Sequence, residues 1–180
     1  MTEKMRWFDR AFSLDLPDWM YPNVLERLRG TPVRLEERIK TIPEDLLIRR
    51  YNDSWSIQEN AGHLLDLEPL WAGRLDDFIT GEEKLRPADL TNRRTHEANH
   101  NADSIEDILQ PFRDARFEFS GRLEKLDEAT ALRSCLHPRL NAPMRVLDMM
   151  FFIAEHDDHH LARISELYRI LSDESGHAVE

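Results

Sequence analysis

Two histidines near the C-terminal end of the chain have the spacing of metal ligands on a helix. His156 and His160 lie in a stretch where apolar residues such as Met149, Ile153 and Ile164 recur in steps of three and four. Because side chains four residues apart point the same way on a helix, we expect both imidazoles to face the core. Buried polar groups are costly unless something binds them, so this spacing predicts a divalent metal site.

A third ligand must come from another segment of the chain. His63 falls at the edge of the apolar face of another predicted helix, and packing of the helices can bring it across to His156 and His160. Zinc sites with three protein ligands keep a position open and are usually catalytic, whereas structural sites are closed by four. The open position would polarise a substrate or activate a water. Imidazole suits zinc, nickel, iron or copper, so the ligands do not select the metal.

His159 and Glu59 have alternative interpretations. His159 lies three residues after His156 and could replace His160 as a ligand, or could lie on the helix surface. Glu59 could be a ligand, could orient a ligand, or could act as a base. Ser56 and Glu59, however, have the spacing of a capping box, and that role accounts for Glu59.

Glu68 is the candidate catalytic residue. It falls near the middle of the apolar face of the helix that carries His63. There it could act as a general base or accept a hydrogen bond from a ligand imidazole. The alternative is an internal ion pair with an arginine, because carboxylates are rarely buried without a partner.

Several other polar residues have a functional and a structural interpretation. Asp157 or Asp158 could hold a ligand imidazole, but we predict a solvated helix face for them. His96 and His100 are four residues apart in a polar loop, where solvated side chains are the default and a second metal site is the alternative. Cys135 is predicted to be inert, unless it is exposed close to the metal.

Four amphipathic helices are expected to position these residues. We predict them over residues 22–41, 56–80, 105–126 and 143–171, with a kink or split near residue 30 in the first. The chain shows no strand-like alternation, so the pattern predicts an all-α four-helix bundle. Residues 1–20 are expected to form an N-terminal arm, residues 21–172 the bundle and residues 173–180 a polar tail.

Composition excludes several classes of protein. The 180 residues carry a formal net charge of −11 without a basic patch, which disfavours nucleic-acid binding. No apolar run reaches the roughly 18 residues that a membrane span requires, and the N-terminus lacks the apolar core of a signal peptide. A single cysteine suits a reducing compartment. We therefore expect a cytoplasmic protein without a membrane partner.

Two motifs together resemble the DinB/YfiT-like superfamily. They are Trp55-Ser-Ile-Gln-Glu-Asn-Ala-Gly-His63-Leu and Glu155-His-Asp-Asp-His-His160-Leu-Ala-Arg-Ile, and their separation suits that family. The segment Glu26-Arg-Leu-Arg-Gly-Thr-Pro32 is also similar to it. The resemblance covers roughly residues 20–172, and the paired motifs are more specific than either alone.

The resemblance implies a four-helix bundle that binds one divalent metal, often as a dimer. Mapped by motif, the metal ligands are His63, His156 and His160. Characterised members resemble transferases or isomerases that use low-molecular-weight thiols, or are described as metal-dependent hydrolases. The resemblance thus implies zinc, nickel or iron as cofactor, with a thiol as a further one, and a homodimer that acts on a small-molecule substrate.

We therefore expect a metal-dependent enzyme that acts on a small electrophile, first as a thiol-dependent transferase. A hydrolase is the alternative, and a non-catalytic metal-binding or interaction protein is a second one. A fourth protein ligand without a cavity would favour the non-catalytic class, because no coordination position would remain for a substrate.

Overall fold

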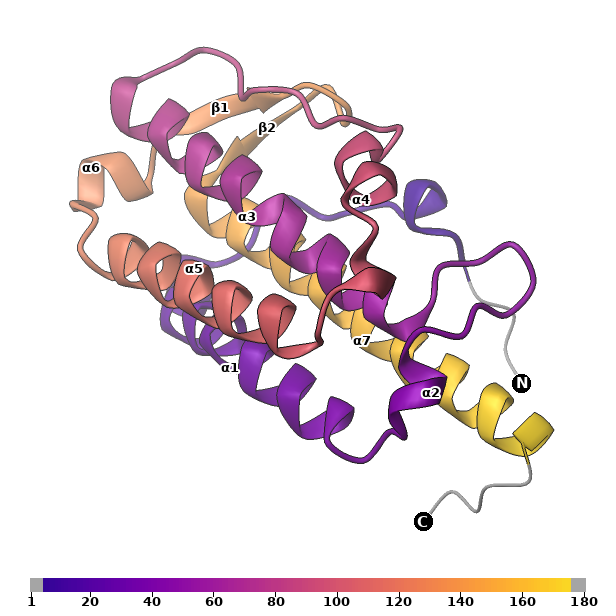
Figure 1. Cartoon of the computed structure of the whole chain (residues 1–180). Coiled ribbons are helices and arrows are strands. Elements are labelled where there is room, and N and C mark those ends of the chain that lie inside the picture. Colours follow the sequence, from indigo (N-terminus) through magenta and orange to yellow (C-terminus); the bar gives the residue numbers. More distant parts are fainter. Residues whose placement is uncertain (1–4, 176–180) are drawn as a thin grey trace.

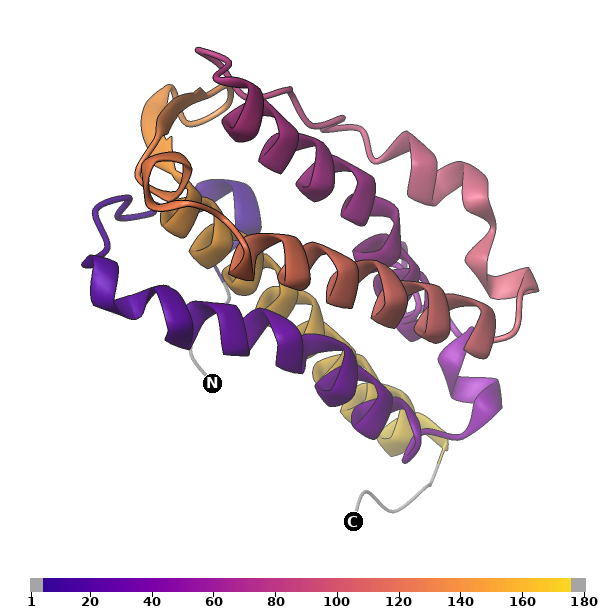
Figure 2. The same ribbon diagram turned by 90° about the vertical axis from the view of Figure 1, so that its left-hand side faces the viewer.

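Four long helices form the body of the protein (Figure 1). The computed structural model describes residues 5–175, and its long helices are α1 (Tyr21–Ile39), α3 (Ile57–Thr80), α5 (Glu106–Glu124) and α7 (Val146–Ser175). Helices α1 and α3 each pack against both α5 and α7, which closes the bundle (Figure 2). The predicted all-α four-helix bundle is confirmed.

Shorter elements connect the long helices. They are η1 (Trp7–Asp9), η2 (Asp18–Met20), α2 (Glu44–Leu47), α4 (Arg93–Ala98), η3 (His100–Ala102), α6 (Glu128–Ala131) and the strands β1 (Ser134–His137) and β2 (Ala142–Arg145). The two strands form an antiparallel hairpin in which Cys135 pairs with Met144. The hairpin was not predicted and lies at one end of the bundle, before α7 (Figure 1).

The start and the end of α3 follow local capping rules. The Ser56 hydroxyl accepts a hydrogen bond from the Glu59 backbone N–H at 3.0 Å, and the Glu59 carboxylate accepts one from the Ser56 backbone N–H at 2.8 Å. This is the predicted capping box. Gly81 ends the helix with φ of 81°, a left-handed conformation that glycine adopts without a Cβ clash.

Helix boundaries differ most from the predictions in two helices. Helix α1 runs through Gly30 and Pro32 as one α-helix, so the chain is not split there. Helix α7 begins at Val146, three residues after its predicted start, because the preceding residues form β2, and it continues to Ser175, four residues beyond its predicted end. Residues 5–20 form the described part of the predicted arm, and apolar side chains in it, Trp7 among them, pack against the core. Residues 1–4 of the arm and 176–180 of the tail lie outside the described residues.

A layer of polar side chains divides the core into two apolar clusters. One cluster contains Leu28, Phe119 and Ile153, and the other contains Leu35, Phe112 and Ile164. Each of the four long helices contributes buried polar residues to the layer between the clusters: Thr31, His63, Glu68, Arg116, His156, Asp157 and His160. Since buried polar groups need partners, this layer is the candidate location of a ligand-binding site.

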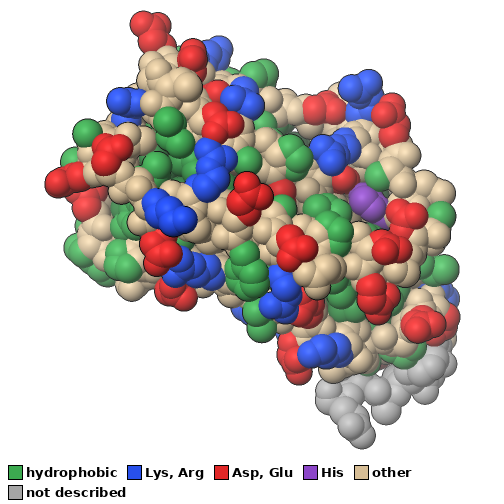
Figure 3. All heavy atoms as spheres, turned by 60° about the vertical axis from the view of Figure 1, so that its left-hand side comes forward, with side chains coloured by type: hydrophobic (Ala, Val, Ile, Leu, Met, Phe, Trp, Pro, Cys, Tyr) green, Lys and Arg blue, Asp and Glu red, His purple; other side chains and the backbone are tan. Residues whose placement is uncertain are grey.

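On the face drawn in Figure 3, positive and negative side chains are interspersed and neither sign forms a broad patch. Among residues 5–175, no helix is both long enough and apolar enough to cross a bilayer.

Candidate metal centre

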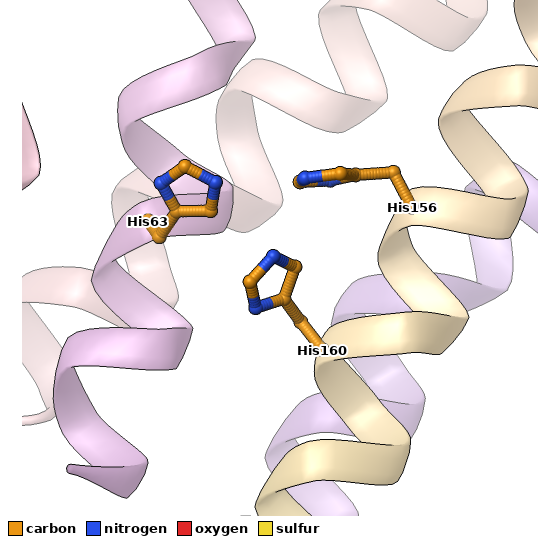
Figure 4. Close-up of side chains that lie close together, drawn as sticks. All are labelled: His63, His156 and His160. Atoms are coloured by element: carbon orange, nitrogen blue, oxygen red, sulfur yellow. The ribbon is translucent and has the colours of Figure 1, made fainter. Parts of the chain in front are cut away.

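The three histidines expected to bind a metal lie together. His63 projects from α3, His156 and His160 project from α7, and their rings point toward one another (Figure 4). One nitrogen from each ring can be chosen so that all three lie within 4.8 Å of one another. The side chains are buried, with 4%, 6% and 7% of their surface exposed. We call these residues the histidine triad.

The ring packing within the triad follows from its two helices. The centroids of His156 and His160 are 4.6 Å apart, as expected for ring side chains one turn apart on a helix. The His63 ring lies 4.8 Å from His160 and 5.3 Å from His156, across the interface between α3 and α7. The indole of Trp55, just before α3, packs 4.8 Å from His63. The ring orientations are thus fixed by packed helices rather than by a loop.

Asn60 orients the ring of His160. Its side-chain nitrogen donates to the carbonyl oxygen of Ser56 at 2.7 Å, which directs its oxygen toward His160. That oxygen lies 2.9 Å from Nδ1 of His160 and accepts the ring N–H. A neutral imidazole with the proton on Nδ1 has its lone pair on Nε2. This arrangement leaves Nε2 of His160 free to bind a metal.

Thr95, on α4, orients the ring of His63 in the same way. Its hydroxyl oxygen lies 3.0 Å from Nδ1 of His63. The hydroxyl is also hydrogen-bonded to Asp66. A hydroxyl that donates to a carboxylate accepts from the imidazole, so Nε2 of His63 keeps its lone pair. Partners of this kind set the tautomer of metal-binding histidines and raise their affinity for the ion.

His100 extends this chain and corrects a prediction. It was expected to be solvated, but its ring is buried and its Nε2 lies 2.8 Å from Oδ2 of Asp66. Burial raises the pKa of Asp66, but hydrogen bonds from His100 and Thr95 outweigh burial and hold it below its ordinary value. Gly62 permits this packing, because a Cβ there would lie 2.3 Å from the His100 ring. His96, by contrast, is exposed.

The electrostatics of the triad favour neutral rings. Burial lowers the pKa of His63 to about 4. Burial, together with the neighbouring imidazoles, also holds the pKa values of His156 and His160 well below the ordinary value. All three rings are therefore neutral at pH 7, and the neutral imidazole is the form that binds a metal.

His156 has an unsatisfied ring nitrogen that a bound cation would explain. Its Nδ1 is buried and, among the described residues, has no hydrogen-bond partner. An unsatisfied buried ring nitrogen carries a desolvation penalty of roughly 1–3 kcal/mol. A metal ion that took Nδ1 of His156 as its ligand atom would remove this penalty, so the residues present fit a metal. Beyond the triad, the described residues offer no fourth histidine, cysteine or carboxylate to that group.

A pocket opens beside the triad. Its volume is about 330 Å³, within the range of small-molecule sites, and all three triad histidines line it. The walls between the triad and the far end are largely aromatic and include Trp71 and Phe152. Such walls exclude water and contact apolar parts of a ligand. A free coordination position would therefore face space that a small molecule can enter.

Glu68 lies away from this pocket. It is buried and its carboxylate bonds to the guanidinium of Arg116, at 3.1 Å from Nε and 2.6 Å from Nη2. It is absent from the residues that line the pocket. Burial raises the pKa of Glu68, and Arg116 opposes that shift. The structure therefore favours the internal ion pair over the catalytic role for Glu68.

Asp157 corrects a second prediction. It was expected on a solvated face, but it is fully buried and forms an ion pair with Arg116. It also accepts a hydrogen bond from the Thr31 hydroxyl at 2.9 Å. The reason is the helix itself: one residue after His156 is a rotation of about 100°, which turns Asp157 toward α1 and α5. We call Thr31, Glu68, Arg116 and Asp157 the Arg116 cluster.

The remaining candidates have structural partners. Glu59 bonds to Arg50 as well as to the capping box, and Asp158 is half-buried in ion pairs with arginines of α1. His159 lines the pocket, with Nδ1 3.2 Å from the guanidinium of Arg10. Cys135 is buried in the hairpin, and its thiol lies 3.0 Å from the Glu82 carbonyl oxygen.

Sequence reasoning missed the residues that hold the triad in place. Asn60 lies three residues before His63 and is buried on the same helix, so its helical spacing was a usable signal. Thr95 offered no such signal, because it comes from α4 and meets His63 through tertiary packing. The aromatic and cationic residues of the pocket were also missed.

Comparison with known protein families identifies the family of this chain. A family model described as the DinB superfamily matches residues 27–164, which is most of the chain. No curated protein matches it in a sequence search. Because the family model covers more than half of the sequence, the chain belongs to the DinB superfamily.

Two solved structures share the fold. YfiT from Bacillus subtilis, described as a probable metal-dependent hydrolase with an unusual four-helix bundle topology, superposes with a TM-score of 0.78 and 19% identity, over 94% of this chain and 95% of YfiT. A mycothiol-dependent maleylpyruvate isomerase superposes with a TM-score of 0.67 and 10% identity, over 86% of this chain and 63% of the isomerase. At these identities the likeness shows the fold alone.

Proposed function

We propose that the protein binds one divalent metal ion through His63, His156 and His160 and is a metal-dependent enzyme that acts on a small electrophile. One observation carries this proposal: three buried, neutral imidazoles converge within 4.8 Å at the wall of a pocket. Three ligands with a free position facing a cavity are the arrangement of catalytic rather than structural zinc sites. Zinc, nickel and iron are all compatible with the ligand set.

Residues of the chain itself orient the histidines and exclude water from the site. A bound divalent cation would supply a Lewis acid that activates a water or a thiol. Asn60 and Thr95 hold the outer nitrogens of His160 and His63 and so keep the inner nitrogens unprotonated. Trp71 and Phe152 form apolar walls that exclude bulk water from the reacting groups.

The reaction that we propose first is transfer to or from a low-molecular-weight thiol. A metal lowers the pKa of a thiol bound to it, so thiolate chemistry suits an open three-histidine site. The fold neighbour described as a mycothiol-dependent isomerase is a precedent on the same scaffold. Hydrolysis is the alternative, because the same free position serves a water, and the YfiT description is its precedent.

Metal analysis tests the first part of the proposal. Purified protein loaded with Zn²⁺, Ni²⁺ or Fe²⁺ and then desalted should hold close to one equivalent of metal, measured by inductively coupled plasma mass spectrometry. His156→Ala and His160→Ala should lose it, whereas His96→Ala, which removes an exposed histidine, should keep it. Equal metal content in all four proteins would contradict the ligand assignment.

An activity screen tests the second part. The metal-loaded protein is assayed with thiols plus small electrophiles and with small esters and amides, and the same assays are repeated with His156→Ala. Metal-dependent formation of an adduct between the thiol and the electrophile supports the transferase. Metal-dependent cleavage of an ester or amide without a thiol supports the hydrolase. Full metal binding without turnover of any substrate would favour the non-catalytic class. The homodimer remains a prediction, tested by sedimentation velocity.

A further inference from the structure

The far end of the pocket is rich in hydrogen-bond donors. Arg74 projects into it from α3, and His137 and Arg139 reach it from the hairpin, at the end of β1 and in the turn that follows. We call these three residues the cationic end of the pocket. None of them belongs to the histidine triad or contacts the Arg116 cluster through a hydrogen bond.

Arg74 is a buried guanidinium without a carboxylate partner. It is 2% exposed, its Nε donates to the Arg86 carbonyl oxygen at 3.1 Å, and it forms no ion pair with any residue of the described part of the chain. The nearest acidic influence is Asp77, whose carboxylate is paired with Arg86 at 2.6 Å. Burial lowers the pKa of Arg74 to about 10, which leaves it charged at pH 7. Its positive charge therefore has no directly paired carboxylate among the described residues.

Arg139 adds a second unsatisfied group. Its Nη2 is buried and has no hydrogen-bond partner among residues 5–175. The guanidinium carbon lies 5.4 Å from the ring centroid of Phe8 and 5.8 Å from that of Phe152. Aromatic faces stabilise a cation but accept no strong hydrogen bond, so the N–H groups of Nη2 remain unpaired.

His137 cannot satisfy all of the donors around it. Its Nδ1 lies 3.1 Å from the Leu140 backbone nitrogen and 3.3 Å from that of Arg139, while its Nε2 lies 3.2 Å from Nη1 of Arg74. A neutral imidazole accepts at one nitrogen only. If Nδ1 accepts, Nε2 carries a proton and faces another donor. Burial and the two arginines lower the pKa of His137 to about 4, so the ring is neutral.

The acidic side chain that lines the pocket is already engaged. Asp89 lines the same pocket but is exposed. One of its oxygens accepts from the Thr91 backbone at 2.9 Å and from the Thr91 hydroxyl at 2.6 Å, and the other accepts from the Arg93 backbone at 3.0 Å. Donors thus exceed acceptors at the cationic end, and an anion is the ligand that corrects the imbalance.

We propose that the cationic end binds the carboxylate of a small organic acid whose other end reaches the histidine triad. Guanidinium groups match the planar geometry of a carboxylate and bond it through paired N–H donors. The Trp71 ring centroid lies 6.1 Å from the His156 ring and 5.4 Å from the guanidinium carbon of Arg74. One indole therefore separates the two ends, and a small molecule can span them.

This inference deepens the proposed function, since it names the substrate class for the same pocket. The carboxylate would anchor the substrate, the aromatic walls would contact its apolar body, and the reacting group would lie at the triad. Binding energy from an anchor remote from the reacting atoms can orient a substrate for reaction. Arg139 and Arg74 would thus determine specificity without touching the reacting atoms.

The test compares two ligands of nearly equal shape on metal-free protein. Phenylacetate carries the carboxylate and phenylacetamide replaces it with a neutral amide. Both are titrated by calorimetry into EDTA-treated wild-type protein, Arg139→Gln, Arg74→Gln and the control Arg169→Gln, which removes an exposed arginine of α7. Circular dichroism and thermal melts establish that each variant is folded.

We expect wild type and Arg169→Gln to bind phenylacetate about 10- to 100-fold more tightly than phenylacetamide. Arg139→Gln should remove most of that preference even if Arg74→Gln proves too unstable to measure. Equal affinities for the two ligands in wild type, or no binding of phenylacetate, would overturn the proposal. A carboxylate preference that is unchanged in Arg139→Gln would overturn it as well.

Metal dependence separates this proposal from the proposed function. If the preference for phenylacetate persists in EDTA-treated protein and in His156→Ala, the cationic end binds carboxylates whether or not the triad holds a metal. If the preference occurs only with metal bound and disappears in His156→Ala, the carboxylate is a ligand of the metal, and the cationic end is not its site.

Discussion

The bundle contains two buried polar clusters that begin at neighbouring residues of α7, and they are built in opposite ways. In the Arg116 cluster, one guanidinium bonds to two carboxylates, and the Thr31 hydroxyl bonds to one of them. In the histidine triad, three neutral rings converge with no carboxylate of the described residues among them, and Nδ1 of His156 has no partner there either.

The difference teaches which buried polar groups point to a ligand. Burial alone does not, because both clusters are buried in the same layer between the two apolar clusters. The Arg116 cluster links α1, α3, α5 and α7 and is satisfied by the chain itself, as a structural network must be. In the triad, by contrast, Nδ1 of His156 lacks a partner among residues 5–175, and the three rings line a pocket. Four predictions test this contrast.

Removing the charge at the centre of the Arg116 cluster should have the largest effect. Arg116→Met would leave Glu68 and Asp157 buried without a counterion, and we expect a loss of about 3–5 kcal/mol in the free energy of unfolding, measured with urea. Arg122→Met, at a half-exposed ion pair on the same helix, should lose about 1 kcal/mol or less. Similar losses in both variants would show that the cluster is not the structural link between the helices.

Glu68→Gln tests whether the cluster is structural or catalytic. The amide keeps the shape but loses the charge, so we expect a stability loss of about 1.5–3 kcal/mol with unchanged metal content. Glu118→Gln, which alters an exposed carboxylate of α5, should leave stability nearly unchanged. Full stability combined with loss of turnover in Glu68→Gln would instead restore the catalytic role predicted from the sequence.

Thr95→Val tests whether the triad depends on its outer hydrogen bonds. Valine has nearly the same shape as threonine, but it cannot accept the N–H of His63. We expect the dissociation constant for the metal to rise by about 10- to 100-fold, measured by competition with a chelator. Thr130→Val, which removes a buried hydroxyl in α6, is the matched control and should bind metal as wild type does. Equal affinities in both variants would show that Thr95 does not tune the site.

The stability of the metal-free protein should fall as the pH is lowered from 6.5 to 5. His63 has a folded-state pKa of about 4 because it is buried, whereas in the unfolded chain it titrates near 6.5. As the pH falls, the unfolded state therefore takes up a proton that the folded state refuses, and stability decreases.

The expected slope is about 1.4 kcal/mol per pH unit for each imidazole that remains neutral in the folded state. Urea unfolding at pH 6.5, 6 and 5 measures it, and His63→Leu should reduce the slope by the share of one histidine. A stability that does not change over this range would show that the buried rings are protonated in the folded protein.

Much of the bundle could be predicted from the sequence because its signals are local. The capping box of Ser56 and Glu59 marks the start of α3, Gly81 marks its end, and the spacing of His156 and His160 places two imidazoles on one face. The hairpin could not be predicted in this way. Its strands have four residues each, too few for a reliable alternation, and one of them contains Pro143.

The surroundings of the site could not be predicted because they depend on contacts between distant segments. His100 seemed solvated in a polar loop, yet that loop folds over α3 and buries the ring against Gly62. Asp157 seemed to belong to a surface, yet its partner Arg116 lies 41 residues away in the sequence. Neither contact leaves a periodic pattern in the chain, so only the fold reveals it.

In the proposed carboxylate site, the hairpin adds His137 and Arg139 to the arginine that α3 supplies, Arg74. Its turn carries Arg139 and joins β1 to β2, whereas the histidine triad sits on α3 and α7. Residues in such a turn tolerate replacement far better than residues in the core, so the tip of the hairpin is where this scaffold can acquire a preference for a different molecule. Libraries restricted to residues 138–141 would explore new selectivity while the helices remain untouched.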